Sequence, residues 1–573
     1  MRGMLSKVFL FQSYKCYTQP CYYINPERKI YMEILELSLR SSNQFMNDLT
    51  DQNLKNDLFF DYNIHSKEVF QNRAADLKNR SFQREEISAY LKQYAKRFSA
   101  NHEKTIENIE KLKHPESVVV IGGQQAGLLT GPLYTIHKII SIIVLARKEE
   151  EELGIPVIPI FWIAGEDHDF AEINHIFTAK DKVPKKLTIK DAPLKKQSVS
   201  ELILTQQKTL EWIEDVFETF GETDHSNYLL DQLSNCVKQS NTYVEFFEHV
   251  IMSLFKNEGL VLVNSGDPGL RQLEKSCFQS ILEHNSRIYD AVKMQQQEMR
   301  AQNYNPIIEM SENSANLFYH HEGERFLLER QNDSEFVVTD IGLTMSKAQL
   351  FDVIETNPQN LSNNVVTRPI MQEYLFPTLA FIAGPGEVTY WAELKKVFST
   401  LDMKMPPVLP RLTITLLERP IERNLNETNL MLDEVLHEGV EKAIESFLKS
   451  VSPIDMNPLV DEAKNKIADI HECLIHEALK IDASLEPMLK KNGVFIQEQL
   501  NFLLHSVEKR KRQLHDVHLS KFKSIELSLC PNIQPQERMW NVYYYLNRFG
   551  PDFVGELLNL SYSFNNKHKV VKI

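Results

Sequence analysis

The sequence predicts an α/β fold, in which helices cover a parallel sheet and a helical coiled coil follows. Three observations predict it. Short apolar runs that end in glycine-rich or acidic loops alternate with segments of helical periodicity. Heptad spacing begins beyond residue 417. The composition, 42% hydrophobic and 25% charged, is typical of a globular chain, and 573 residues suffice for more than one domain.

Charge and cysteine content exclude several classes of protein. The chain has 64 Lys+Arg against 78 Asp+Glu, a net charge of −14, so nucleic acid is not an expected partner. Apolar runs stay well short of the ~20 residues that span a bilayer, so no membrane partner is expected. The six cysteines lack metal-type spacing, and a reducing cytoplasm fits them best. Residues 1–31 are expected to be an N-terminal extension outside the chemistry.

The elements of the core follow in order from residue 32. Helical spacing covers about 43–113, and the β-branched run 117–121 predicts a buried strand that ends at Gly122-Gly123. A helix over about 132–152 and a second strand over 157–164 complete a β-α-β unit. Further apolar runs that end in loops lie at 260–264, 379–382 and 408–416, which gives about five strands.

The core is predicted to occupy 32–417, with insertions at about 180–255 and 270–365; the second insertion contains a hairpin around 321–323. Heptads then predict an antiparallel coiled-coil domain over 418–525, with its turn near Pro487 and Gly493. A projection of this kind more often serves structure or dimerisation than catalysis. The last segment, 526–573, is predicted to pack back on the core.

Ligands of open α/β sheets bind at the carboxyl ends of the strands, so the loops there are the candidate site. In the first loop, the glycines around Gln124 and Gln125 let backbone N–H groups approach a ligand, and the helix that follows favours an anion. His137 and Lys138 lie about two turns into that helix, with Tyr134 one turn earlier. The alternative is a glycine-rich turn that only ends the strand.

The second loop crowds like charges. Glu166, Asp167 and Asp169 surround His168, and Asn174 and His175 follow. Crowding should raise the pKa of at least one carboxyl group and keep the imidazole protonated, which suits a general base near neutral pH. A divalent metal site or an acidic helix cap are the alternatives.

Two further loops complete the rim. One offers Asp267. In the other, Glu387 and Tyr390 lie one helical turn apart and would point toward the same crevice. Upstream, Arg368 has a planar fork that matches a carboxylate, although an ordinary surface salt bridge would also explain it.

Several long motifs, in this order, resemble the cysteine ligase family of bacillithiol biosynthesis (the BshC family). They lie at 123–138, 161–170, 384–394, 536–538 and 545–550. The resemblance covers nearly everything from Met32 onward. It implies a Rossmann-like core with inserted connecting domains, a C-terminal coiled coil that forms a homodimer, and the addition of cysteine to glucosaminyl-malate as the last step of the pathway.

The core is similar in turn to class I aminoacyl-tRNA synthetases. Their motif Gly-Pro-Leu-His-x-Gly-His aligns with residues 131–137, where Tyr134 replaces the first His and Ile136 the second Gly. The similarity implies a nucleotide, ATP or ADP. Its expected contacts are either Gly131, Tyr134, Gly384 and Gly386 in the crevice, or Thr415, Leu416, Leu417 and Trp540 away from it.

A ligase of this kind must deprotonate a sugar amine and activate the carboxylate of cysteine. Glu166, Asp167 or His168 is the expected base, while His137 and Lys138 would offset developing negative charge. The substrate-binding candidates are Gln124, Gln125, Asp169, Asn174, Arg368, Glu387 and Tyr390, with Arg368 and the two glutamine amides on the malate carboxylates. No metal is assigned.

Two alternatives belong to other classes. One is a metal-dependent hydrolase or amidase that uses the 166–169 cluster together with His175. The other is a non-catalytic assembly protein whose coiled coil recruits partners of the pathway.

Overall fold

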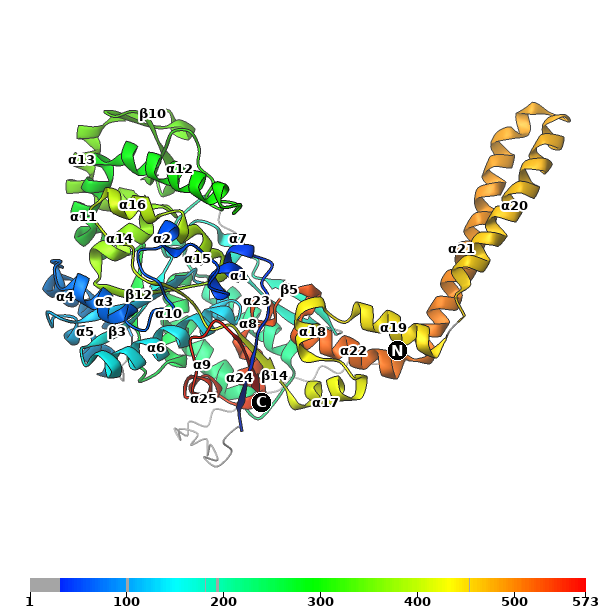
Figure 1. Ribbon diagram of the computed structural model, residues 1–573, viewed down its shortest axis with the longest axis horizontal. Coiled ribbons are helices and arrows are strands. Elements are labelled where there is room, and N and C mark those ends of the chain that lie inside the picture. Colours follow the sequence, from blue (N-terminus) through cyan, green and yellow to red (C-terminus); the bar gives the residue numbers. More distant parts are fainter. Residues whose placement is uncertain (1–30, 99–102, 181, 192–194, 453) are drawn as a thin grey trace, which may run out of the picture.

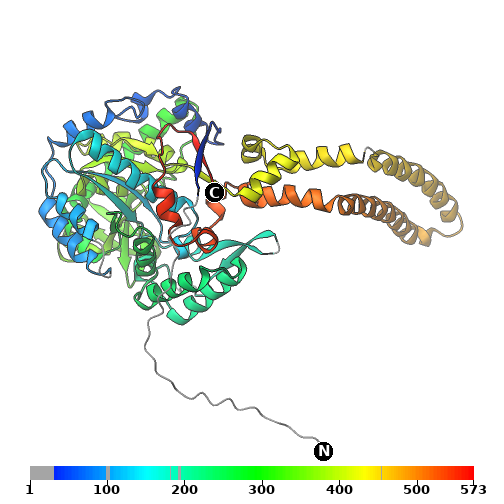
Figure 2. The ribbon, with the colours of Figure 1, turned by 90° about the horizontal axis from the view of Figure 1, so that it is seen from below.

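The computed structural model describes residues 31–98, 103–180, 182–191, 195–452 and 454–573. The predicted extension therefore lies outside the described residues, apart from Tyr31. A compact body carries the sheets, and a long helical stalk projects from it (Figures 1 and 2). In the described residues, no helix combines the length and the apolar character that crossing a membrane requires.

The centre of the body is a five-stranded parallel sheet, as predicted, in the order β13-β12-β2-β3-β6. Its strands are β2 (Val118–Gln124), β3 (Val157–Ile163), β6 (Val261–Asn264), β12 (Thr378–Ala383) and β13 (Val408–Pro410). Helix α6 (Tyr134–Leu153) connects β2 to β3, which confirms the β-α-β unit.

The predicted end of β2 at Gly122-Gly123 is wrong, because the strand continues to Gln124. Both glycines pair with β3, opposite Phe161 and Trp162. A Cβ on Gly122 would lie 2.8 Å from the Ile382 carbonyl oxygen, so glycine permits close strand packing here.

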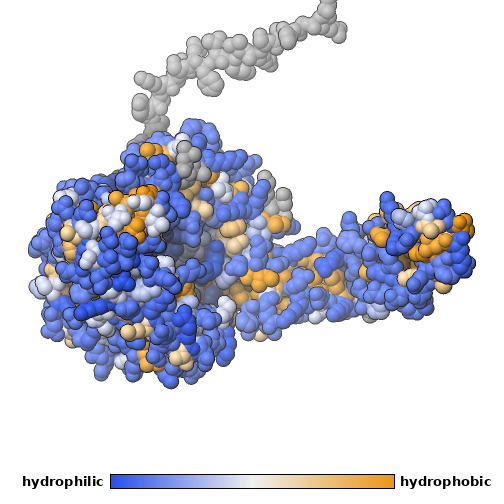
Figure 3. Space-filling view, turned by 90° about the horizontal axis from the view of Figure 1, so that it is seen from above, coloured by the Kyte–Doolittle hydropathy of each residue, from blue (hydrophilic) through white to orange (hydrophobic). Residues whose placement is uncertain are grey.

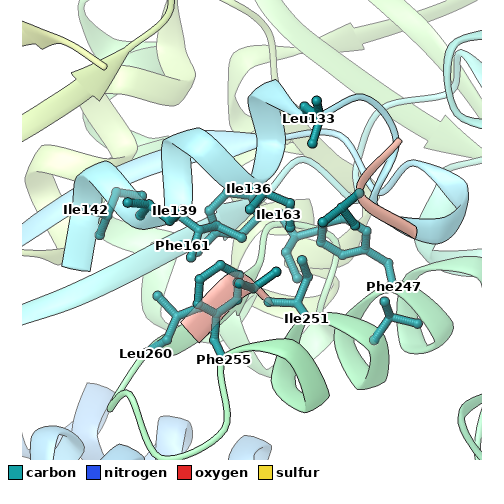
Figure 4. Packing of buried hydrophobic residues seen from close by; sticks show 14 of the residues in the cluster. Leu133, Ile136, Ile139, Ile142, Phe161, Ile163, Phe247, Ile251, Phe255 and Leu260 are labelled. Carbon is teal, nitrogen blue, oxygen red and sulfur yellow. The ribbon is translucent and has the colours of Figure 1, made fainter. Parts of the chain in front are cut away.

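Both faces of the sheet are covered, so its strands are apolar on both sides. On one face, α6 and α10 (Tyr243–Leu254) pack against Phe161 and Ile163 (Figure 4). On the other face, Ile158, Ile160 and Trp162 pack against helices from the second insertion. The five helices α1–α5, between Gln44 and Lys111, confirm the predicted helical region before the sheet.

The insertions bring sheets of their own. After β3, β4 (His175–Lys180) and β5 (Val183–Thr188) form a hairpin, followed by helices α8–α10. The second insertion holds a five-stranded antiparallel sheet that includes β7 (Ser314–His321), β8 (Glu324–Asn332) and β11 (Leu361–Asn363). The β7–β8 turn confirms the predicted hairpin.

The run predicted as one strand over 408–416 is two strands in different sheets. β13 ends at Pro410, and β14 (Ile414–Leu417) joins β15 (His568–Lys572) and β1 (Glu33–Leu37) in a three-stranded sheet. The Arg411 backbone N–H makes the last bond from β13 to β12, at Ala383 O, and Pro410 has no N–H that could bond to a further strand. The C-terminal segment therefore packs on the core through β15.

The stalk confirms the antiparallel hairpin, built from α20 (Met456–Leu479) and α21 (Glu486–Leu514). The predicted place of its turn is wrong. The chain turns over 480–485, whereas Pro487 and Gly493 both lie within α21. Pro487 fits there because backbone N–H groups in the first turn of a helix have no acceptor within the helix, so the N–H that proline lacks is not needed. A single glycine costs a helix only about 1 kcal/mol, which the stalk tolerates.

Candidate functional site

The crevice lies at the carboxyl ends of β2, β3 and β12, and Lys138 is its most buried cation. The Lys138 Nζ donates to Gly123 O at 2.7 Å, Gln124 Oε1 at 3.2 Å and Glu387 Oε2 at 2.5 Å. Burial lowers the Lys138 pKa, although Glu387 opposes the shift. All three ammonium hydrogens have acceptors within the protein. Lys138 therefore links the end of β2 to Glu387 and has no hydrogen left to donate to a substrate.

Glu387 is the carboxylate partner of Lys138 in this ion pair. It lies in the first turn of α15 (Pro385–Ala392), as predicted, and Oε2 also accepts from the Gly384 N–H at 2.6 Å. The ion pair therefore joins the end of β2 to the start of α15.

Asp167 and His168 form the accessible part of the acidic loop, and each side chain is about one-third exposed. Asp167 Oδ2 accepts from Gln125 Nε2 at 3.0 Å. Arg325 Nη1 lies 3.7 Å from Asp167 Oδ1 and 3.1 Å from His168 Nδ1. A cation thus sits where the sequence predicted only crowded negative charge.

This cation reverses the predicted electrostatics. Burial raises the pKa of Asp167, but the Gln125 hydrogen bond and the Arg325 charge outweigh it, and the net pKa is lowered. Burial and Arg325 also lower the pKa of His168. The prediction of a raised carboxyl pKa and a protonated imidazole in this pair is therefore wrong. Asp167 is a carboxylate and His168 a neutral ring at neutral pH.

Arg325 comes from β8 in the second insertion, and sequence reasoning missed it. Its guanidinium is buried, stacks 3.7 Å from the Phe318 ring centroid, and donates to Ser362 Oγ and Asn363 O. No motif marks it; its place two residues after the hairpin glycine Gly323 is the sole signal in the sequence.

Glu166 is closed off from the crevice. Only 3% of its side chain is exposed, and Oε2 accepts from Arg271 Nη2 at 2.6 Å and the Asn363 N–H at 3.2 Å. This buried pair ties β3 to the second insertion. Of the three predicted bases, Glu166 therefore has the least access to a substrate.

Arg368 and Tyr390 complete the crevice. Arg368, on α14 (Thr367–Leu375), lies 3.5 Å from the Tyr390 hydroxyl through Nη2, and its charge acts on both Lys138 and Asp167. The predicted residues brought together here are Gln124, Gln125, Lys138, Asp167, His168, Arg368, Glu387 and Tyr390.

Three predicted residues have other partners. Asp169 caps α7 (Phe170–Ile173) by accepting from the Ala171 N–H at 3.0 Å, in agreement with the helix-cap alternative. Asn174 Oδ1 lies 3.2 Å from His175 Nδ1 at the start of β4. Asp267 caps α11 (Pro268–Glu283) and pairs with Arg97 at 2.8 Å.

His137 faces away from Lys138, because neighbouring helix residues point about 100° apart. Its ring is fully buried, and Nδ1 lies 3.1 Å from Glu537 Oε2. Both oxygens of Glu537 are also held by Arg411, at 2.7 and 2.5 Å. Burial lowers the pKa of His137, and Glu537 offsets this only in part. His137 is thus a neutral ring joined to the C-terminal segment.

The predicted nucleotide-binding residues do not lie together. Thr415 and Gly386 line one of about 650 Å³, and Trp540 lines another of about 210 Å³. Tyr134 is the first residue of α6, and Gly131 lies just before it. The Arg411 guanidinium is 5.9 Å from the Tyr134 ring centroid. The remaining three have structural positions: the Gly384 N–H donates to Glu387 Oε2, both backbone groups of Leu416 bond to Gln536, and Leu417 packs in the stalk base.

Among the described residues, no group of three or more His, Cys, Asp or Glu side chains is arranged to hold a metal ion. In the 166–169 cluster, Arg271 and Arg325 occupy the positions beside the acidic groups that a cation would take.

A parallel sheet with paired cations and carboxylates at its strand ends, carrying inserted domains and a coiled-coil stalk, defines a Rossmann-like enzyme that acts on small molecules. The family model described as "Bacillithiol biosynthesis BshC, N-terminal Rossmann-like domain" matches residues 32–412, and that of the C-terminal coiled-coil domain matches 414–573. The chain belongs to this family of bacillithiol biosynthesis.

Relatives from three species are similar over nearly the whole chain. Proteins named "Putative cysteine ligase BshC" from Bacillus velezensis and Bacillus licheniformis are 48% and 46% identical, and each match covers 95% of this chain and 100% of the relative. The protein of that name from Geobacillus thermodenitrificans is 43% identical, again over 95% and 100%.

Proposed function

We propose that the protein joins cysteine to glucosaminyl-malate through an amide bond, as the last step of bacillithiol biosynthesis. Family membership supports the pathway, and the printed name of the relatives supports the reaction type. The observation that carries the proposal is the accessible Asp167 carboxylate between Gln125 and Arg325, at the end of a parallel sheet.

Asp167 is the proposed base. The sugar amine must lose a proton before it attacks, and a carboxylate that stays ionised at neutral pH can accept one. His168 is less suited, because its Nδ1 faces Arg325 and its other nitrogen then carries the hydrogen. Glu166 is already engaged by Arg271.

Two arginines are the proposed anchors for the malate carboxylates. Arg368 makes one long contact, at 3.5 Å, so its fork stays available for a planar anion. Arg325 directs Nη1 toward Asp167 and His168 while its other nitrogens are engaged. The amides of Gln124 and Gln125 lie beside them and supply neutral hydrogen-bonding groups.

ATP is the proposed source of activation. The cysteine carboxylate would form an adenylate with release of pyrophosphate, or an acyl phosphate with release of ADP, and the sugar amine would then displace AMP or phosphate. The cavity of about 210 Å³ beside Trp540 is proposed to hold the adenine ring of ATP or ADP, because Phe177, Phe220 and Tyr544 also line it. Trp540 Nε1 donates to Leu527 O at 3.0 Å, which fixes the indole plane. Trp540→Ala should abolish adenine nucleotide binding; unchanged binding would reject this location.

A homodimer through the stalk is proposed as well. Two helices alone leave much of their seam uncovered: Ile470, Leu474 and Phe502 are 61%, 60% and 67% exposed. Apolar side chains gather at the far end of the stalk (Figure 3). A second stalk would cover them. The proposed compartment is the cytoplasm, where the free thiols Cys236, Cys277, Cys473 and Cys530 stay reduced.

The test of the function is incubation of the pure protein with glucosaminyl-malate and cysteine, with and without ATP. Mass spectrometry should detect the joined thiol only with ATP. A product that forms equally without ATP would retain the ligase and reject the activation scheme, and no product under either condition would reject both.

A further inference from the structure

We propose that the protein has a second small-molecule site, for an anion with two or more negative charges, where the core, the stalk base and the C-terminal segment meet. This junction encloses the cavity of about 650 Å³, within the usual range for small-molecule sites. Its walls come from residues 39–50, 385–386, 410–415, 435–439, 529–538 and 563–568. Neither Asp167 nor Trp540 lines this cavity.

The charge of the cavity is opposite to that of the whole chain. Glu537 is the one carboxylate among the described residues that line it, in a chain with 78 Asp+Glu. Arg411 holds both of its oxygens, and the Arg411 charge keeps the pKa of Glu537 well below its usual range despite burial. The floor is therefore a neutralised ion pair, and the remaining charges on the walls are positive.

Two of these cations have no competing partner. Arg538 and Lys567 are exposed at the rim, and neither side chain makes an ion pair or hydrogen bond with any other described residue. A third, Arg40, makes only a long contact of 3.8 Å with Asp51. The Arg538 charge also lowers the pKa of Tyr134 against the larger effect of burial, so its field reaches the buried start of α6.

The start of α15 also borders this space, where Pro385 has no N–H and the Gly384 N–H already donates to Glu387 Oε2. Helix α15 begins at Pro385, and a Cβ built on Gly386 would meet no atom within 4 Å, so the first turn of this helix faces open space. A helix start is favourable for an anion. Ser41, Ser42 and Ser563 also line these walls, and the Ser563 hydroxyl is already bonded to Glu36 and Lys569.

The number of free cations indicates the ligand class. A singly charged ion would leave two of Arg40, Arg538 and Lys567 unmatched, whereas a small dicarboxylate or a pyrophosphate-bearing molecule matches them. Carboxylate and phosphate share this chemistry. The site does not depend on the proposed ligase activity, so binding alone tests it.

The experiment is calorimetric titration of the full chain in 150 mM NaCl, with L-malate as the carboxylate probe and inorganic pyrophosphate as the phosphate probe. At this ionic strength, attraction between distant surface charges is largely screened. The rim variant is Arg538→Gln/Lys567→Gln. The control, Arg287→Gln/Lys396→Gln, removes the same charge from two exposed residues that do not line the cavity.

At least one probe should bind saturably, and the rim variant should weaken that binding at least tenfold while the control stays within twofold; malate held by Arg325 and Arg368 would add a component that the rim variant leaves unchanged. Whichever probe binds identifies the ligand chemistry. Trp540→Ala should leave binding unchanged, which separates this site from the proposed nucleotide site. The absence of saturable binding by both probes, or saturable binding that the rim variant weakens no more than the control does, would overturn the proposal. Arg538 and Lys567 are both exposed, so their replacement should not disturb the fold. Circular dichroism melts of the rim variant that match those of the unaltered chain would verify this.

Discussion

The side-chain amide of Asn541 donates a hydrogen bond of 2.7 Å to the carbonyl oxygen of Gly131, and a second of 2.8 Å to that of Leu129. The loop it holds is strained, since Leu129, Thr130 and Gly131 have φ angles of 48°, 75° and 68°. Non-glycine residues in this region cost about 1–3 kcal/mol each, and surrounding structure must hold them. The C-terminal segment therefore fixes the loop from which α6 starts.

Asn541→Ala should release this loop. Two buried carbonyl groups would lose their donor, so the free energy of unfolding should fall by about 1–3 kcal/mol. Hydrogen exchange of the backbone amides in 127–135 should accelerate. Asn559→Ala, at an exposed position after α25 (Phe553–Leu558), is the control and should change neither quantity. Unaltered exchange in the Asn541 variant would show that the loop holds itself.

The buried pair of Lys138 and Glu387 should behave as a unit. Lys138→Met or Glu387→Gln alone leaves one member without its partner, and each should cost roughly 3 kcal/mol in urea unfolding. The double variant should cost clearly less than the sum. Strict additivity of the two changes would argue against direct coupling.

Arg325→Gln should raise the pKa of both Asp167 and His168, because it removes the positive charge beside them. The acid limb of the kcat/KM profile should move to higher pH. Arg330→Gln lies on the same strand but pairs outward with Asp333, and serves as the control. Identical pH profiles for both variants would remove Arg325 from the site.

Glu248 should make stability depend on pH. Burial raises its pKa to about 8, although hydrogen bonding to Tyr94 and the Arg97 charge oppose the shift. The folded chain thus keeps a proton that the unfolded chain releases near its ordinary value of 4.5. This stabilisation is complete below that value and is lost as pH rises through about 8.

Glu248→Gln, which cannot ionise, should therefore flatten the decline in melting temperature between about pH 5 and 9. Glu245→Gln, on the same helix but on a less buried carboxylate, is the control. A decline of the same slope in the Glu248 variant as in the unaltered chain would place the titration elsewhere.

Hydrophobic periodicity in the sequence predicted the helices whose buried face it determines. The helical pattern over about 132–152 predicted α6, and the heptads predicted the stalk, because periodicity reflects which face of a helix is buried. The turn position is not determined in this way: Pro487 predicts a break between the heptad runs, but it lies in the first turn of α21.

The site was predictable only where its residues follow strands. Gln125, Asp167 and Glu387 were found in this way. Arg325 was not, since it reaches Asp167 across 158 positions (325 − 167) from another sheet and leaves no local pattern. The contact of Glu537 with His137 is unpredictable for the same reason, because the two residues are 400 positions apart in the chain.

The role of Asp167 is the central claim, and one rate comparison tests it. With glucosaminyl-malate, cysteine and ATP, Asp167→Asn should form the joined thiol at least about a hundredfold more slowly than the unaltered chain, the scale of a lost general base. Asp191→Asn is the control, since hydrogen bonds also lower the pKa of that carboxylate against burial, but outside the crevice. Near-normal turnover by the Asp167 variant would contradict the account.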